Sequence, residues 1–361
     1  MAGLILVVNP GSSSLKLRLL GPKDEVEEAH DIEHWNGSAE VPELAELAAG
    51  ASAVGVRVVH GGRSFPGPCR VDDAVVDRLE ALAPLAPLHQ PRSVAALRAV
   101  RATRPGVPVV ACFDTAFHAS LPPEAATYAL PREWNERWGL RRYGFHGLSH
   151  QYAARRVADW VGPSARTVVC HLGAGASLCA VRDGRSLDTT MGFTPLEGLV
   201  MATRSGTVDP GLVLWLVTEA GLAAGEVADH LERRSGLAGL SGTSGDLREV
   251  LERVGGGDRS ACLAFDVYIH RLRREIGAMV AALGGLDVLV YTGGVGERAS
   301  VVRAAVAEGL AYLGAAIDEA RNASTTWDGE ITAPGAAVRT LVLTAREDVE
   351  IATEVRQVVG G

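Results

Sequence analysis

Several polar side chains interrupt apolar segments of this sequence, and their types suit the handling of phosphate and carboxylate groups. Arg57 stands within a strand-like run of valines, where it needs an anionic partner because burying an unpaired charge is costly. Asp114 follows the apolar stretch VPVVACF, at the end of a predicted buried strand, where α/β folds place ligand contacts. From these segments alone, a structural ion pair for Arg57 and a capping role for Asp114 stay open.

A histidine and a second arginine lie in segments that are rich in turn formers. His146 stands between a phenylalanine and a glycine, and His150 follows at a spacing that metal ligands also use. No Cys, His and carboxylate set accompanies the two histidines, so we expect a hydrogen-bonding histidine in a cleft and not a zinc site. Arg204 lies in the long segment 189–211, whose composition is typical of a functional loop. A packed Ω-loop with a solvated arginine is the alternative.

Further along the chain, charged residues and glycines stand at predicted helix starts. Asp246 is a satisfactory N-cap, whereas Arg248 in the first turn opposes the helix dipole, which favours a ligand or an ion pair. The GGVGER turn at 293–298 would let the backbone approach a nucleotide closely, although such a turn is a weak signal. Glu347 and Asp348 would either cap a helix or hold a hydrated Mg²⁺. Together these groups suit phosphoryl transfer, which needs alignment and charge neutralisation.

The elements that would position these residues begin at NPGSSSLK, residues 9–16. Its glycine, serines and lysine resemble a phosphate-binding P-loop, but a P-loop has the spacing GxxxxGK[ST] and continues into a helix. Here apolar and polar residues alternate from Leu15 to Leu19, which predicts a second strand and therefore a β-hairpin. The stretch TVVCHLGAGASLCAV at 167–181 repeats this pattern, and GRSLDTT adds a third strand. Two such hairpins suggest an internal duplication.

Strand and helix patterns alternate after each hairpin. We expect strands at 107–113, 286–292 and 338–344, and helices at 73–84, 92–105, 148–161, 260–283, 300–313 and 348–359. This alternation predicts an α/β fold with a mainly parallel sheet.

Composition limits the class of protein. A chain of 361 residues with 47% hydrophobic residues suits two domains that share one ligand cleft. A net charge of −8 argues against a nucleic-acid or anionic-membrane surface, and Lys16 and Lys23 are the only lysines. Five scattered cysteines without a CxxC pair fit a reducing cytoplasm. The apolar start is too short for a signal peptide, and no stretch approaches a membrane span, so we expect a soluble intracellular protein.

Seven motifs, in order, resemble the acetate kinase family of acetate and propionate kinases. They are NPGSSSLK, RVVHGG, FDTAFH, YGFHGLSH, HLGAGASL, MGFTPLEGLVMATRSGTVDP and TGGVGER. The resemblance runs from Leu4 to about Ala352 and implies an ASKHA fold, in which two duplicated ribonuclease-H-like (actin-like ATPase) domains flank the active site. We expect the first domain at 1–117 plus 350–361 and the second, nucleotide-binding domain at 118–349.

The resemblance also implies an activity and its partners. The implied reaction is the reversible, direct in-line transfer of the γ-phosphoryl group of ATP to acetate, giving acetyl phosphate and ADP. Mg²⁺, with Mn²⁺ as an alternative, would assist, and the protein would be a cytoplasmic homodimer without nucleic-acid or membrane partners.

Carried over by motif, the site residues fall into four groups. The catalytic group is Asp114, His146 and Arg204. Arg57 would face the substrate carboxylate or the transferring phosphoryl group, and the apolar pocket for the acyl methyl would be Val59, Leu88, Phe145 and Pro195. The nucleotide contacts would be Lys16, Ser12, Ser14, His171, Leu172, Gly173, Ala174, Gly175, Asp246, Leu247, Arg248, Gly293, Gly294, Val295, Gly296 and Glu297. The Mg²⁺ environment would be Asn9 and Glu347.

The sequence departs from the family pattern at a few positions. Pro10 stands where alanine is more usual, Ala174 and Gly245 stand where asparagine is usual, and the segment 30–50 is shorter than in relatives. We expect the loss of the amide side chains at positions 174 and 245 to alter nucleotide contacts or the preference for a phosphoryl donor. A propionate or other short-chain acyl kinase is the alternative, because one methylene in an apolar pocket is worth only about 1–3 kcal/mol. A non-catalytic nucleotide-binding regulator is the alternative from another class.

Overall fold

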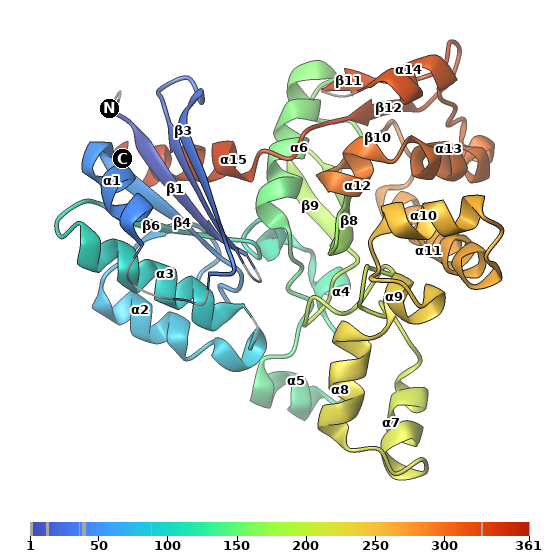
Figure 1. Ribbon diagram of the computed structural model, residues 1–361, viewed down its shortest axis with the longest axis horizontal. Helices are drawn as coiled ribbons and strands as arrows, with labels where there is room; N and C mark the ends of the chain where they lie inside the picture. The colour runs from blue at the N-terminus through green and yellow to red at the C-terminus, as the bar shows by residue number, and fades with distance from the viewer. Residues whose placement is uncertain are drawn as a thin grey trace. The chain divides into compact units, whose positions relative to one another are not determined.

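A computed structural model describes residues 3–11, 14–35, 37, 41–87, 89–325 and 328–360 (Figure 1). Two of the predicted site residues, Ser12 and Leu88, lie outside the described residues. The chain divides into two compact units. Unit 1 comprises residues 1–119, 145–152 and 346–361, and unit 2 comprises 120–144 and 153–345.

These units differ from the expected domain limits in three short segments. Residues 118–119, 145–152 and 346–349 were expected in the second domain and belong to unit 1. The last two of these segments have a structural reason. Segment 145–152 joins unit 1 because the backbone N–H of Gly147 donates to the carbonyl of Asp114 at 2.8 Å. Segment 346–349 leads into a helix whose apolar face packs in the core of unit 1.

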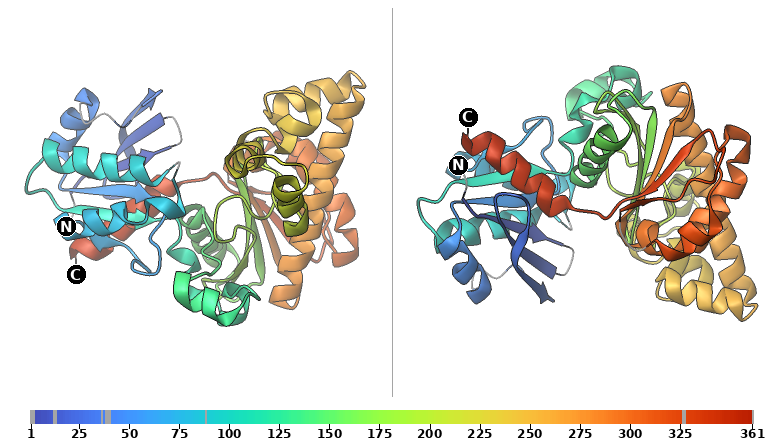
Figure 2. Two further views of the ribbon diagram at one scale, coloured as in Figure 1. Left: turned by 90° about the horizontal axis from the view of Figure 1, so that it is seen from below. Right: turned by 90° about the horizontal axis from the view of Figure 1, so that it is seen from above.

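The sheet of unit 1 has the order β3-β2-β1-β4-β6-β5. Its strands are β1 (Ile5–Pro10), β2 (Ser14–Leu20), β3 (Val26–Glu33), β4 (Ala53–Val58), β5 (Cys69–Arg70) and β6 (Val109–Phe113). Alternate residues of β1 enter different cores, because successive strand side chains point to opposite faces. Leu6 and Val8 pack with the buried residues of α1 (Pro42–Gly50), α2 (Asp73–Glu80) and α3 (Gln90–Thr103). Ile5 and Val7 pack with α15 (Glu347–Gly360), on the other face (Figure 2).

Unit 2 contains a sheet of the same design, with the order β11-β12-β10-β7-β8-β9. Its strands are β7 (Thr167–Leu172), β8 (Ala176–Arg182), β9 (Arg185–Thr189), β10 (Val288–Thr292), β11 (Gly329–Glu330) and β12 (Arg339–Val342). In each unit the chain first forms an antiparallel meander of three strands. Two later strands run parallel to the first strand of the meander, and a short strand pairs antiparallel with the outer of these two at the edge of the sheet. The predicted duplication is therefore confirmed.

The prediction of mainly parallel sheets was wrong. Among the described strands, each sheet has two parallel and three antiparallel pairings. The parallel pairings are confined to the middle, because each hairpin forms its own antiparallel ladder before the first crossover helix.

The remaining helices are mostly short. They are α4 (Pro123–Ala126), α5 (Arg132–Trp138), α6 (Gly147–Trp160), α7 (Pro210–Thr218), α8 (Ala224–Arg233), α9 (Gly236–Ser241), α10 (Leu247–Gly255), α11 (Arg259–Leu283), α12 (Gly293–Arg298), α13 (Ser300–Gly309) and α14 (Glu319–Ser324), with 3₁₀ turns η1 (Ala83–Leu85), η2 (Phe117–Ser120) and η3 (Ala311–Leu313). The GGVGER segment, expected as a turn, forms the short helix α12. In the described part of the chain, no helix has both the length and the apolar character needed to cross a membrane.

Candidate active site

Four polar residues of unit 1 meet at the carboxyl end of its parallel strands. Asn9 lies near the end of β1, Arg57 lies on β4, Asp114 directly follows β6, and Glu347 begins α15. Arg57 Nε donates to both carboxylate oxygens of Asp114 at 3.0 and 3.1 Å, and its Nη2 donates to Oδ2 at 2.5 Å. Arg57 Nη1 donates to Asn9 Oδ1 at 3.2 Å, and Asn9 Nδ2 donates to Glu347 Oε2 at 3.1 Å. The ion pair expected for Arg57 is thus made with a predicted site residue.

The charges in this cluster are buried and strongly coupled. The Asp114 side chain is 2% exposed, and the Arg57 side chain is 16% exposed. Burial raises the pKa of Asp114, although the charge of Arg57 opposes this. Burial also lowers the pKa of Arg57, but Asp114 and Glu347 outweigh it and leave that pKa above its usual range. The guanidinium therefore stays protonated, and two carboxyl groups surround one fixed cation.

The oxygens of this cluster suit Mg²⁺, but they do not form a full cage. Within the described ranges, no group of three or more His, Cys, Asp or Glu residues could hold a metal ion. Mg²⁺ usually keeps several waters and binds through one or two carboxylates together with substrate phosphates. Asn9 and Glu347, which are hydrogen-bonded to each other, match that sparse donor set.

His146 adopts an unusual backbone conformation beside this cluster. Its φ is +56°, a left-handed value that few residues other than glycine adopt and that is often found at functional sites. The turn is held from both sides, because His118 Nε2 donates to the Phe145 carbonyl at 3.0 Å and Gly147 packs against the Asp114 backbone. His146 is half-buried and lies one residue before α6.

Two of the residues expected to contact the acyl group are buried in unit 1. Val59 is 5% exposed and Phe145 is 2% exposed. The Phe145 ring meets the edge of His60, with 5.6 Å between ring centroids. Burial lowers the pKa of His60 to about 4, so this ring is neutral and adds to an apolar wall. Pro195 belongs to unit 2.

Arg204 has an incomplete set of partners in unit 2. Its Nη1 donates to the Pro195 carbonyl at 3.0 Å and to Met201 Sδ at 3.6 Å. Considering the described residues only, no carboxylate lies within 4.0 Å of this guanidinium. Burial lowers the pKa of Arg204. The charge of Glu232 opposes this shift from beyond ion-pair distance. A half-buried guanidinium without a carboxylate in contact is suited to an anionic ligand.

The loop that holds Pro195 is braced by residues that the sequence interpretation missed. Glu197 Oε1 accepts from Arg142 Nη2 at 2.6 Å, and Glu197 Oε2 accepts from the Tyr128 hydroxyl at 2.6 Å. Arg142 also donates to the carbonyls of Thr190 and Met191, both at 3.1 Å. The position of the carbonyl that orients Arg204 therefore depends on this brace. A glutamate inside the MGFTPLEG motif was the available signal.

A cavity of about 650 Å³ in unit 2 collects many of the predicted nucleotide contacts. Among the predicted residues, Gly173, Ala174, Asp246, Leu247, Arg248, Gly294 and Val295 line it. Lining residues that were not predicted are Ala202, Thr203, Leu237, Ser244, Gly245, Leu251, Tyr268, Arg298 and Ala299. They come from the segment between β9 and α7 and from α9, α10, α11 and α12 with their flanking turns. The meeting of these elements is a tertiary property that no local motif encodes.

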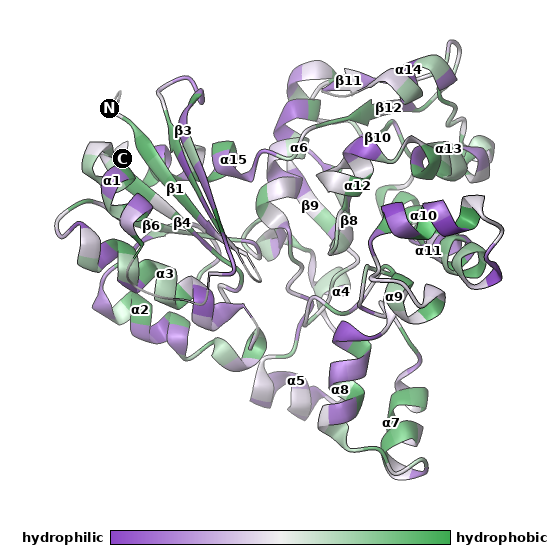
Figure 3. Ribbon diagram, viewed as in Figure 1, coloured by the Kyte–Doolittle hydropathy of each residue, from purple (hydrophilic) through white to green (hydrophobic). Residues whose placement is uncertain are grey.

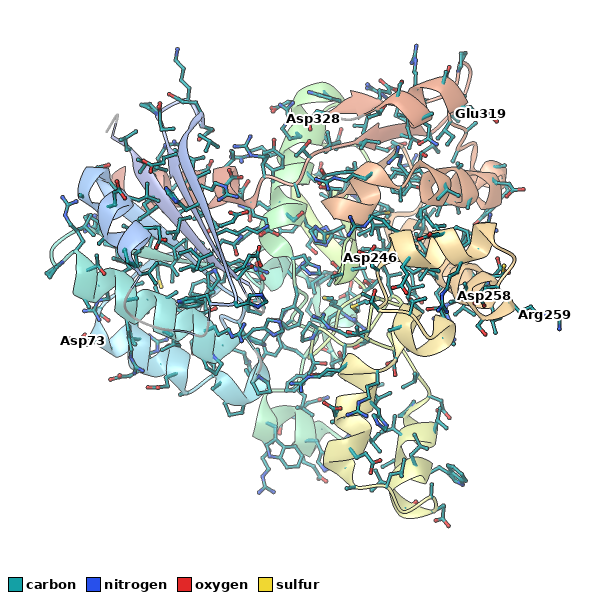
Figure 4. All side chains as sticks on the ribbon, in the orientation of Figure 1. Asp73, Asp246, Asp258, Arg259, Glu319 and Asp328 are labelled. Carbon is teal, nitrogen blue, oxygen red and sulfur yellow. The ribbon has the colours of Figure 1, made fainter. Side chains whose placement is uncertain are left out.

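Two charged residues of this cavity hold each other. Asp246, labelled in Figure 4, caps α10 by accepting from the backbone N–H of Arg248 at 2.9 Å. Arg248 Nε and Nη2 also donate to its carboxylate, the latter at 2.5 Å. The predicted N-cap at Asp246 is therefore confirmed. Of the two alternatives for Arg248, a ligand or an ion pair, the structure forms the ion pair, so the cavity wall carries little net charge there.

The remaining predicted nucleotide residues lie around the turns. His171 and Leu172 end β7, and Gly173 and Gly175 close the hairpin turn through a 3.0 Å backbone hydrogen bond. Gly293 has a φ of +77°, and a Cβ there would strike the Leu172 backbone, so only glycine fits. Six predicted nucleotide residues of these turns do not line the cavity, namely His171, Leu172, Gly175, Gly293, Gly296 and Glu297. Ser14 begins β2, and Lys16 is exposed on β2 opposite Asn9.

The two units have the same strand order. One carries a buried guanidinium–carboxylate cluster, and the other carries a glycine-lined cavity. These features define a class of duplicated α/β proteins suited to phosphoryl chemistry. The model of the Acetokinase family matches residues 37–353, and the chain belongs to this family.

Individual relatives agree with this assignment. The chain is 49% identical to an acetate kinase of Rhodopseudomonas palustris over 313 residues, which cover 86% of this chain and 78% of the relative. It is 42% identical to an acetate kinase of Microcystis aeruginosa over 363 residues, which cover 98% of this chain and 90% of the relative.

Solved structures show the same fold. An acetate kinase of Porphyromonas gingivalis has a TM-score of 0.91 at 34% identity, covering 99% of this chain and 100% of that one. A propionate kinase of Francisella tularensis also has a TM-score of 0.91 at 34% identity, covering 98% of this chain and 99% of that one. Together with the matching sheets, this likeness confirms the predicted class of two duplicated ribonuclease-H-like domains.

Proposed function

We propose that the chain catalyses the reversible transfer of the ATP γ-phosphoryl group to acetate, giving acetyl phosphate and ADP. The observation that carries the proposal is the Arg57–Asp114 pair at the strand ends of unit 1, in a chain 49% identical to an acetate kinase. An arginine fork suits both the carboxylate of the acceptor and the oxygens of a transferring phosphoryl group.

The chemistry asks the protein for alignment and charge neutralisation. An acetate oxygen attacks the γ-phosphorus while the bond to the ADP oxygen breaks in line. Acetate is already ionised at neutral pH, so no strong general base is needed. Arg57 would hold the acceptor carboxylate or the phosphoryl group, and Asp114 would orient Arg57 and the acceptor. His146 and Arg204 would neutralise charge that develops on the phosphoryl oxygens.

The nucleotide and the metal would be held by separate groups. The walls of the 650 Å³ cavity would take the nucleoside, and the turn around Gly173 would lie along the phosphates. Lys16 would reach the phosphates from the first hairpin. Asn9 and Glu347 would bind Mg²⁺, with Mn²⁺ as an alternative. When bound, this ion screens the phosphate charge and fixes the orientation of the γ-phosphoryl group.

A hydroxamate assay tests this proposal against its alternatives. With ATP, we expect acyl phosphate from acetate, and from propionate with a kcat/KM that differs by about 10- to 200-fold, because one methylene discriminates only that far. Formate and butyrate complete the acid series, and pyrophosphate replaces ATP as the alternative donor. If propionate exceeds acetate in kcat/KM, the enzyme is a propionate kinase. Protein that binds ATP but forms no hydroxamate from any acid is a non-catalytic regulator.

We also propose a cytoplasmic homodimer that forms through α7. The five cysteines are free thiols, as expected of a reducing compartment. Helix α7 is apolar along most of its length, as its green ribbon in Figure 3 shows, and none of its residues is buried. Its side chains Leu212, Leu214 and Trp215 are 48%, 64% and 54% exposed. Contiguous exposed apolar residues of this kind mark interaction sites, and a second copy of the chain is the partner that the family resemblance implies.

Replacing Leu214 and Trp215 with glutamate is expected to yield a monomer. Two charges in an apolar interface would each lose their hydration without a partner, so association should fail. Light scattering after size exclusion would report the mass. Tyr312→Glu changes the most exposed large hydrophobic residue among those that the structure describes, at 75%, and should leave the dimer intact. A double variant that still elutes as a dimer would place the interface elsewhere.

A further inference from the structure

Arg303 on α13 is the largest of the fully buried side chains in the described part of the chain, with 1% of its surface exposed. Within the same residues, no carboxylate lies within ion-pair distance of it. Burial lowers its pKa, which measures the cost of keeping this charge inside. Such a residue needs an explanation, because an apolar side chain of similar volume would fill the space at lower cost.

The partners of Arg303 supply that explanation. Its Nη1 donates to the carbonyls of Gly296 and Glu297, both at 2.8 Å. Its Nε donates to Asn322 Oδ1 at 2.7 Å, and its Nη2 donates to the Asn322 carbonyl at 2.8 Å. One planar fork thus joins α12 to α14, and no other side chain could reach these acceptors together.

The two backbone acceptors belong to the last turn of α12, whose carbonyls have no partner within the helix. A cation is favourable there, because it meets the negative end of the helix dipole. The same short helix contributes Gly294, Val295 and Arg298 to the wall of the 650 Å³ cavity. A six-residue helix has little stability of its own, so its position depends on such external contacts.

Other contacts of α12 place it from different sides. Glu297 Oε1 accepts from the Ala345 backbone N–H at 2.9 Å. Asn322 Nδ2 donates to the Ser300 carbonyl at 3.0 Å, which secures the asparagine that orients Arg303. The Gly293 end is set against the Leu172 backbone. Arg303 therefore fixes the C-terminal end of a segment whose first residue is already fixed.

We propose that Arg303 is a positioning residue for nucleotide binding, which holds α12 in the geometry that the nucleotide requires without touching the nucleotide itself. The proposal rests on the nucleotide role assigned to the cavity above. It predicts that loss of Arg303 weakens nucleotide binding selectively, because the acceptor site in unit 1 does not depend on α12.

Calorimetric titration with ADP and steady-state kinetics would test this in Arg303→Met, which is similar in length but uncharged. We expect the Kd for ADP and the KM for ATP to rise about tenfold, because even a small misplacement of binding groups weakens binding. The KM for acetate should stay within about twofold of the wild-type value. Arg303→Lys should recover part of the affinity. Arg273→Met is the matched control, since Arg273 Nε donates at 3.0 Å to the Ala305 carbonyl of α13 but does not contact α12.

The outcomes separate this proposal from the proposed activity. A folded Arg303→Met protein with wild-type ADP affinity would overturn it, as would equal rises in the KM values for ATP and acetate. If that variant does not fold, Asn322→Ala decides by the same titration, with a smaller expected rise of about threefold because three of the four acceptors of Arg303 remain, the Asn322 carbonyl among them. ADP binding needs no turnover. A wild-type protein that makes no acyl phosphate therefore contradicts the kinase activity alone.

Discussion

Replacing Arg204 or His146 with alanine is expected to lower kcat by about 10³-fold while the KM values for acetate and ATP change little. Arg204 reaches a carbonyl and a thioether but, among the described residues, no carboxylate. Its charge therefore has most to gain from the phosphoryl oxygens as negative charge builds on them. The left-handed backbone of His146 is the kind of strain that a structure retains at a functional position.

Steady-state kinetics of both variants would check this expectation. Arg233→Ala is the control, because Arg233 is 58% exposed and its ion pair is with Asp229 on the same helix. Arg204→Lys keeps the charge but loses the fork, so an intermediate kcat is expected. An unchanged kcat with raised KM values would mean that these residues bind the ground state and the transition state equally, and it would refute the transition-state role.

Much of the fold follows from local patterns. The alternation from Leu15 to Leu19 identified the first hairpin, and its recurrence at 167–181 identified the second, because strand periodicity is encoded residue by residue. The balance of parallel and antiparallel pairing was not predicted, since it depends on which strands become neighbours. The helical state of GGVGER was also missed. Three glycines disfavour a helix locally, and contacts such as those of Arg303 override that preference.

The site shows the same division between local and tertiary information. Arg57 and Asp114 were identifiable from the sequence, because Arg57 interrupts an apolar strand and Asp114 follows one. A charge at such a position is costly unless it is paired or binds a ligand. Their mutual pairing joins residues 57 positions apart and could not be derived from either segment. The brace on Glu197 joins positions 128, 142 and 197. Residues that support a site through other residues carry no spacing rule of their own, so only the folded chain reveals them.

Replacing Asp114 with asparagine is expected to abolish activity and to lower the free energy of unfolding by up to about 3–5 kcal/mol, because the buried Arg57 loses its nearer counter-charge and keeps only Glu347, 4.0 Å from its Nε. Asparagine keeps the shape and one acceptor oxygen, so the loss reports charge. Asp287→Asn is the matched control. Asp287 binds Arg166 through a similar fork, with one distance of 2.6 Å, but its side chain is 40% exposed, and exposed pairs contribute less than about 1 kcal/mol.

A second substitution separates stability from chemistry at this pair. Arg57→Met in the Asp114→Asn background removes the buried cation that has lost its nearer counter-charge, so part of the lost stability should return in a denaturant titration. Activity should not return, because neither the fork that holds the acceptor nor the carboxylate that orients it is present. If the double variant recovers activity, the pair stabilises the fold and the chemistry lies with other residues. If Asp114→Asn alone keeps both stability and activity, the buried pair is not the centre of the site.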